Sequence, residues 1–93
     1  MIVLLEGTAL KSKQALHETM ACALHFPPWY GGNLDALFDC LTDLHQKTTL
    51  HLRHPEALEQ SLGAYAHRFL QVLRRVEEEN THFQLILSSI VNQ

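Results

Sequence analysis

Three short apolar runs, each separated from the next by helical patterns, most constrain how this chain can fold. Residues 1–6 are continuously apolar up to Glu6 and are closed by Gly7, and residues 47–52 and 83–87 are similar runs. Short apolar runs with these boundaries are typical of β-strands. Because the first run is apolar without alternation, we predict a strand buried on both faces.

Helical patterns fill both intervals between the strands. After the N-cap residue Ser12, apolar residues at helical spacing predict a helix over residues 13–25, which must end before Pro27 and Pro28. After Pro55, which ends the second strand, the pattern predicts a short helix up to Gly63 and then a longer helix.

The helix expected after Asn33, a good N-cap residue, has one apolar face. That face should pack inward, and it consists of Leu34, Leu37, Phe38, Leu41 and Leu44. The resulting order is β-α-α-β-α-α-β, and helices between all strands favour parallel pairing over hairpins. We therefore predict an α/β fold with a three-stranded parallel sheet packed with helices, followed at residues 90–93 by a tail without a predicted element.

Length and composition indicate one globular domain over residues 1–93. The chain has 46% hydrophobic and 18% charged residues, a composition typical of a folded protein. It is long enough to bury a core without metal or disulfide staples and too short for a second domain.

The charge balance argues against direct binding to nucleic acid. Seven Lys and Arg residues stand against ten acidic ones, and the formal net charge is -3. No apolar run reaches the roughly eighteen residues that a membrane span requires. The first residues lack a signal-peptide pattern, and Cys22 and Cys40 lack metal-binding spacing, so we expect a cytoplasmic protein with reduced thiols. A disulfide between these cysteines stays open, because bridging depends on their separation in space.

Three carboxylates recur every four residues on the helix after Asn33. Asp35, Asp39 and Asp43 share one stripe beside the apolar face, where like charges repel one another. One interpretation is a solvated helix surface, and the other is an acidic patch that binds a basic partner. Trp29 and Tyr30 leave a similar choice between anchors of a protein interface and a lid packed under its own turn.

The remaining residues show no motif of a metal site or an enzyme. The seven histidines are scattered along the chain, and we interpret them as surface histidines. No catalytic signature with a Ser, Cys or His is present, so we expect neither catalysis nor a metal or other cofactor. A small hydrolase or metal-binding protein using Asp35, Asp39 and His45 is the least favoured hypothesis.

Residues 28–42, Pro-Trp-Tyr-Gly-Gly-Asn-Leu-Asp-Ala-Leu-Phe-Asp-Cys-Leu-Thr, closely resemble the signature of the barstar family of intracellular ribonuclease inhibitors. A weaker resemblance extends over nearly the whole chain. It implies a single barstar-like domain that blocks a barnase-like ribonuclease by laying this turn and helix into its basic active-site cleft. Asp39 and Asp35 would then occupy the phosphate sites of the cleft.

The resemblance also implies which residues bind the partner. Gly31, Asn33, Leu34, Asp35, Asp39 and Thr42 match the family pattern, and Trp29 and Phe38 keep its aromatic character. Tyr30, Asp43 and Arg75 complete the predicted interface. Asp43 replaces a typical Gly, Leu44 replaces an aromatic residue, and Arg75 stands where some members have an acidic contact.

The leading hypothesis is therefore a ribonuclease inhibitor of the antitoxin or immunity type, a monomer when free. The alternative is a non-inhibitory interaction module on the same fold that binds another basic protein or toxin domain.

Overall fold

The computed structural model describes residues 1–89, and the tail expected at residues 90–93 lies outside the described residues. Its three strands pair in parallel in the order β1-β2-β3, with bounds β1 (Ile2–Glu6), β2 (Thr48–Arg53) and β3 (Phe83–Ser88). The helices are α1 (Lys13–Leu24), α2 (Leu34–Thr42), α3 (Pro55–Leu62) and α4 (Ala64–Glu79), and a 3-10 turn, η1 (Gly7–Ala9), follows β1. This order confirms the predicted α/β fold and its parallel sheet.

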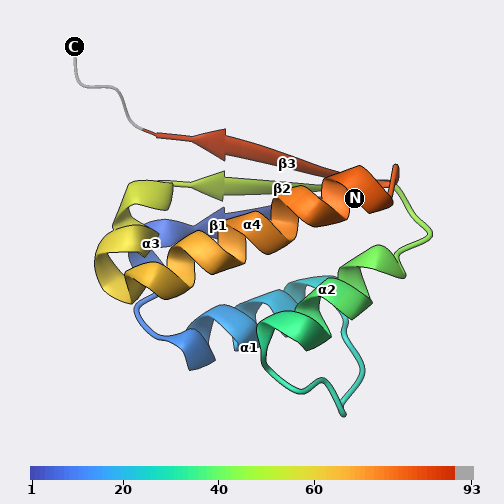
Figure 1. Ribbon diagram of the computed structural model, residues 1–93, viewed down its shortest axis with the longest axis horizontal. Helices are drawn as coiled ribbons and strands as arrows, with labels where there is room; N and C mark the ends of the chain where they lie inside the picture. Colours follow the sequence, from blue (N-terminus) through green and yellow to red (C-terminus); the bar gives the residue numbers. More distant parts are fainter. Residues whose placement is uncertain (90–93) are drawn as a thin grey trace.

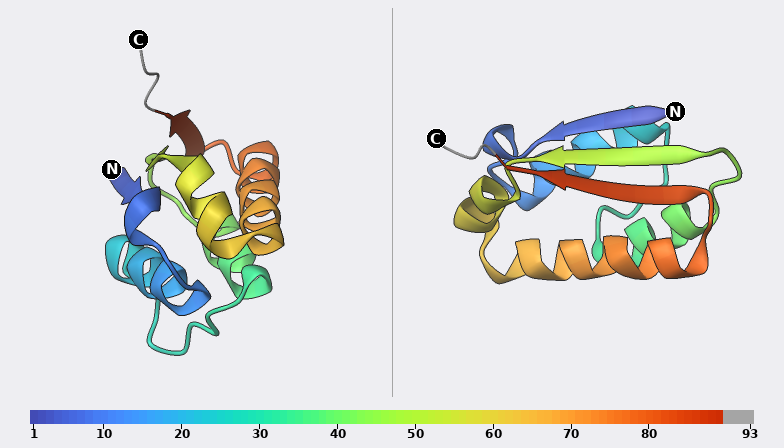
Figure 2. Two further views of the ribbon diagram at one scale, coloured as in Figure 1. Left: turned by 90° about the vertical axis from the view of Figure 1, so that its left-hand side faces the viewer. Right: turned by 90° about the horizontal axis from the view of Figure 1, so that it is seen from above.

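The helices cover one face of the sheet. Figures 1 and 2 show α1, α2 and α4 on the same side of the strands, with the opposite face uncovered. The core lies between these layers and is built from side chains that are buried almost completely, including Leu5, Leu16, Met20, Leu37, Leu41, Leu50, Leu52, Phe69, Leu73 and Val76.

The prediction that residues 1–6 are buried on both faces is wrong. Val3 and Leu5 point into the core, whereas Ile2 is 76% exposed and Leu4 is 59% exposed. Successive side chains of a strand point to opposite faces, and both crossover connections place their helices against the same face. The continuous apolar run therefore forms a strand with one face buried in the core and the other exposed to solvent.

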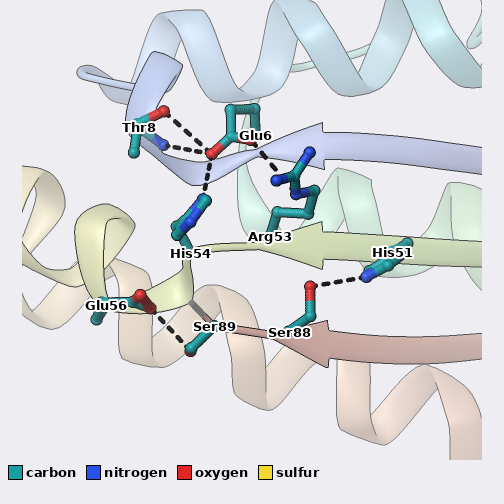
Figure 3. A network of polar contacts seen from close by, with 8 residues as sticks. All are labelled: Glu6, Thr8, His51, Arg53, His54, Glu56, Ser88 and Ser89. Carbon is teal, nitrogen blue, oxygen red and sulfur yellow. Dashed lines mark hydrogen bonds and ion pairs between the residues drawn. The ribbon is translucent and has the colours of Figure 1, made fainter. Parts of the chain in front are cut away.

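Polar contacts link residues at the carboxyl edge of the sheet, where all three strands end (Figure 3). The Glu6 carboxylate accepts a hydrogen bond from Thr8 Oγ1 at 3.0 Å and lies 2.6 Å from His54 Nδ1 and 3.7 Å from Arg53 Nε. The hydrogen bond with His54 is the main reason that the pKa of Glu6 is lowered. Gly7 permits this close approach, because a Cβ at its position would lie 2.1 Å from the His54 carbonyl oxygen.

Candidate functional site

The loop between α1 and α2 and the helix α2 lie on the side of the molecule away from the sheet (Figure 1). Asn33 caps α2 as predicted, because its Oδ1 accepts a hydrogen bond from the Ala36 amide at 2.8 Å. Leu37 and Leu41 are fully buried, and Leu34, Phe38 and Leu44 pack partly buried against the core. The predicted apolar face is thus confirmed, and it fixes which side of α2 faces solvent.

The three carboxylates are on that solvent side. Asp35 and Asp39 are exposed on α2, and Asp43 is exposed at its C-cap. Among residues 1–89, none of the three takes part in an ion pair. Within this described part of the chain, three neighbouring negative charges therefore have no ion-pair partner.

The two aromatic residues of the loop behave differently. The Trp29 side chain is 82% exposed, so it does not pack under its own turn. Tyr30 does: its ring lies 4.8 Å from that of Phe26, and its hydroxyl lies 2.6 Å from His17 Nδ1. Burial raises the pKa of Tyr30, so this hydroxyl stays protonated. Only Trp29 is free to act as an anchor for a partner.

The interpretation of the histidines as surface residues is wrong for His17. Its side chain is buried, and its Nε2 lies 2.6 Å from the Tyr65 hydroxyl on α4. Burial lowers the pKa of His17, which favours the neutral ring. A signal was present in the sequence, because His17 shares the i, i+3, i+7 spacing of the buried residues Met20 and Leu24.

An open hollow of about 400 Å³ lies between the loop and α2. Trp29, Asp39 and Asp43 line it together with apolar side chains, so an aromatic surface and two carboxylates face the same space. Cys40 also lines the hollow, and burial, followed by the neighbouring Asp39 and Asp43, raises the pKa of its thiol. This arrangement suits a cationic side chain, which can meet both carboxylates and a ring face.

Arg75 of α4 lies beside α2. Its guanidinium carbon is 4.6 Å from the centroid of the Phe38 ring, and its Nη2 is 3.9 Å from Glu79. A positive charge thus lies over Phe38 of α2 and pairs with Glu79, not with Asp35, Asp39 or Asp43. Thr42, by contrast, uses its hydroxyl within α2, donating a hydrogen bond to the Phe38 carbonyl at 2.8 Å.

Gly31 and the cysteines complete the description of the predicted residues. Gly31 is exposed near Asn33, and a Cβ there would lie 3.1 Å from the side-chain Nδ2 of Asn33. Cys22 on α1 and Cys40 on α2 are both free thiols. Within the described part of the chain, no group of three or more His, Cys, Asp or Glu side chains is arranged to hold a metal ion.

Comparison with known proteins decides the family. The sequence profile described as "Barstar (barnase inhibitor)" matches residues 1–88. The chain belongs to the barstar family. One relative is the Bacillus subtilis (strain 168) protein named "Putative ribonuclease inhibitor YrdF", which is 36% identical over 87 residues, covering 91% of this chain and 96% of the relative. The barstar fold of this chain thus presents Trp29, Asp35 and Asp39 to solvent from one loop and one helix.

Membership of this family supports an inhibitor-like role for the chain.

Among residues 1–89, no helix is long and apolar enough to cross a membrane.

Proposed function

We propose that this protein inhibits a barnase-type ribonuclease by inserting α2 and the preceding loop into its active-site cleft. The observation that carries the proposal is the uncompensated row of Asp35, Asp39 and Asp43 beside the exposed Trp29. A cleft that binds RNA phosphates carries cationic side chains, and carboxylates on a fixed helix can occupy the same positions. No chemical step is needed, so the protein acts as a blocking ligand and not as an enzyme.

The proposed interface residues divide into those that make charged contacts with the ribonuclease and those that shape the surface. Asp39 enters the phosphate site and receives a cation in the hollow that it shares with Trp29 and Asp43. Asp35 makes a second charged contact from the first turn of α2. Gly31, Asn33, Leu34, Phe38 and Thr42 give the loop and the helix their shape, and Tyr30 supports the loop from below.

We propose that the domain spans residues 1–93 and acts in the cytoplasm as an antitoxin, remaining a monomer until the ribonuclease binds. The two free thiols are in keeping with a reducing compartment.

Titration of the protein into barnase, followed by RNA cleavage, tests the proposal directly. The Asp39→Ala variant should bind more weakly by about 2–5 kcal/mol, because it leaves a cation of the cleft unpaired. Glu59→Gln is the matched control, since Glu59 is an exposed acid on α3, away from α2. Raising the salt concentration should mainly slow association. The proposal would be contradicted if the protein inhibited no barnase-type ribonuclease. It would also be contradicted if Glu59→Gln lost as much binding affinity as Asp39→Ala.

Arg75 sets the choice of ribonuclease. Its guanidinium would face a cationic cleft from beside Phe38, and like charges across an interface weaken binding. Arg75→Glu should therefore tighten binding to barnase by at least about tenfold. Arg74→Glu is the control, because Arg74 is exposed on the same helix and pairs with Glu77 at 3.6 Å. Equal effects of the two substitutions would show that Arg75 acts only through net charge.

A further inference from the structure

A second and larger hollow, of about 640 Å³, lies between α1 and the loop that follows it. Phe26 and Pro27 line both this hollow and the one beside Asp39, so the loop forms a wall between two separate spaces. Binding sites for small molecules commonly have volumes of about 300–1,000 Å³. The proposed inhibitory contacts use the α2 side of the loop and leave the α1 side unassigned.

The loop side of the α1 hollow offers ring surfaces. Phe26, Pro27 and Pro28 line it, and the Phe26 ring is held in place by packing on Tyr30. Flat apolar walls of this kind favour a flat aromatic group, which buries apolar area against them.

The deeper part of the hollow is built on fixed side chains. Tyr30 and His17 both line it, and the His17 ring is held between the hydroxyls of Tyr30 and Tyr65 at 2.6 Å each. Such a floor is formed before any ligand arrives, which lowers the entropic cost of binding.

The α1 side supplies one uncompensated cation. Lys13 Nζ lies 4.7 Å from the centroid of the Tyr65 ring, and among residues 1–89 it forms no ion pair with a carboxylate. Glu18, which also lines the hollow, accepts a hydrogen bond from Gln14 Nε2 at 3.0 Å. One negative charge near Lys13 is therefore favoured, and a second one would meet Glu18.

We propose that the α1 hollow is a binding site for an aromatic molecule that carries a single negative charge. The ring lies against Phe26 and Pro27, and the anionic group is directed toward Lys13. This site lies on the α1 side of the loop, shares Tyr30 with the proposed ribonuclease interface, and binds its ligand in the free protein.

The test uses naphthalene-2-carboxylate as the probe and follows the amide resonances of the isotope-labelled protein by NMR. The probe should shift the resonances of residues 13–22 and 26–32 at millimolar concentrations. Its neutral analogue, naphthalene-2-carboxamide, should bind about two- to fivefold more weakly, as expected for one partly exposed charge pair. Shifts confined to the uncovered sheet face, or equal binding of the two probes, would overturn the proposal.

Two pairs of variants separate a real site from adventitious binding. Lys13→Gln should abolish the preference for the carboxylate, whereas Lys11→Gln, which changes an exposed lysine outside the hollow, should keep it. Ala21→Phe should fill the hollow and remove binding, whereas Thr19→Phe, which changes an exposed α1 residue outside the hollow, should not. Unfolding curves identify any variant that fails to fold. An unchanged preference in Lys13→Gln, or unchanged affinity in a folded Ala21→Phe, would refute the site.

Discussion

His17 connects the loop of the candidate interface to α4 through hydrogen bonds. Its two ring nitrogens bond Tyr30 in the loop and Tyr65 on α4, so one imidazole connects three segments. A neutral imidazole has one donor and one acceptor, so it donates to one tyrosine hydroxyl and accepts from the other. A protonated ring would donate to both hydroxyls, so it is burial of the added charge that favours the neutral state.

Stability should therefore depend on pH through His17. Burial lowers the pKa of His17 in the folded protein, so the unfolded chain binds the proton more readily. The free energy of unfolding should be highest above the unfolded pKa of about 6.5 and should fall as the pH drops below it, by at most about 1.4 kcal/mol per pH unit. His17→Gln should flatten this slope in urea unfolding between about pH 5 and 7. Replacement of the exposed His45 by Gln serves as the control, and a slope that survives in His17→Gln would contradict the assignment.

At the scale of the element, α2 and its two capping residues combine a buried face, an N-cap and a charged stripe within residues 33–43. The cap is matched by a second one: Ser12 Oγ accepts from the Ala15 amide at 3.0 Å at the start of α1, much as Asn33 accepts from Ala36. The two helices therefore allow the effect of capping to be separated from the effect of position.

Asn33→Ala and Ser12→Ala should each lower the free energy of unfolding by about 1 kcal/mol, the usual cost of losing an N-cap. Only Asn33→Ala should also weaken binding to barnase, because α2 and not α1 carries the proposed contacts. Chemical denaturation gives the first quantity and inhibition titration gives the second. Similar losses of affinity in both variants would indicate that binding responds to overall stability alone.

At the scale of the whole molecule, the sequence predicted the helices and strands better than the burial of their side chains and the contacts between them. The strands, the Ser12 and Asn33 caps and the inward face of α2 follow from local spacing, and the structure confirms them. The exposure of Leu4 was missed because spacing within one strand does not report whether helices cover both faces. The burial of His17 could have been inferred from its helical spacing, but its bond to Tyr65, which is distant in sequence, is formed only in the fold.

In the candidate site, too, some features could be predicted from the sequence and others could not. The exposure of Asp35 and Asp39 follows from helical periodicity, and the resemblance to the barstar family gave these residues a proposed role. The position of Arg75 over Phe38 and the hollow beside Asp39 required the packing of α4 and the loop against α2. Contacts between elements are set by the arrangement of the whole core, and no single segment encodes them.

The one-sided sheet leads to a prediction about the whole fold. Ile2 and Val3 are neighbours on β1 that point to opposite faces, and Val3 is only 6% exposed. Thr keeps the β-branched shape at both positions but adds a hydroxyl, which is costly only where it is removed from water. Ile2→Thr should therefore change the free energy of unfolding by no more than about 0.5 kcal/mol, whereas Val3→Thr should lower it by about 1–3 kcal/mol. Urea unfolding of the two variants measures both values. A large loss in Ile2→Thr would mean that the outer face of the sheet is covered in solution.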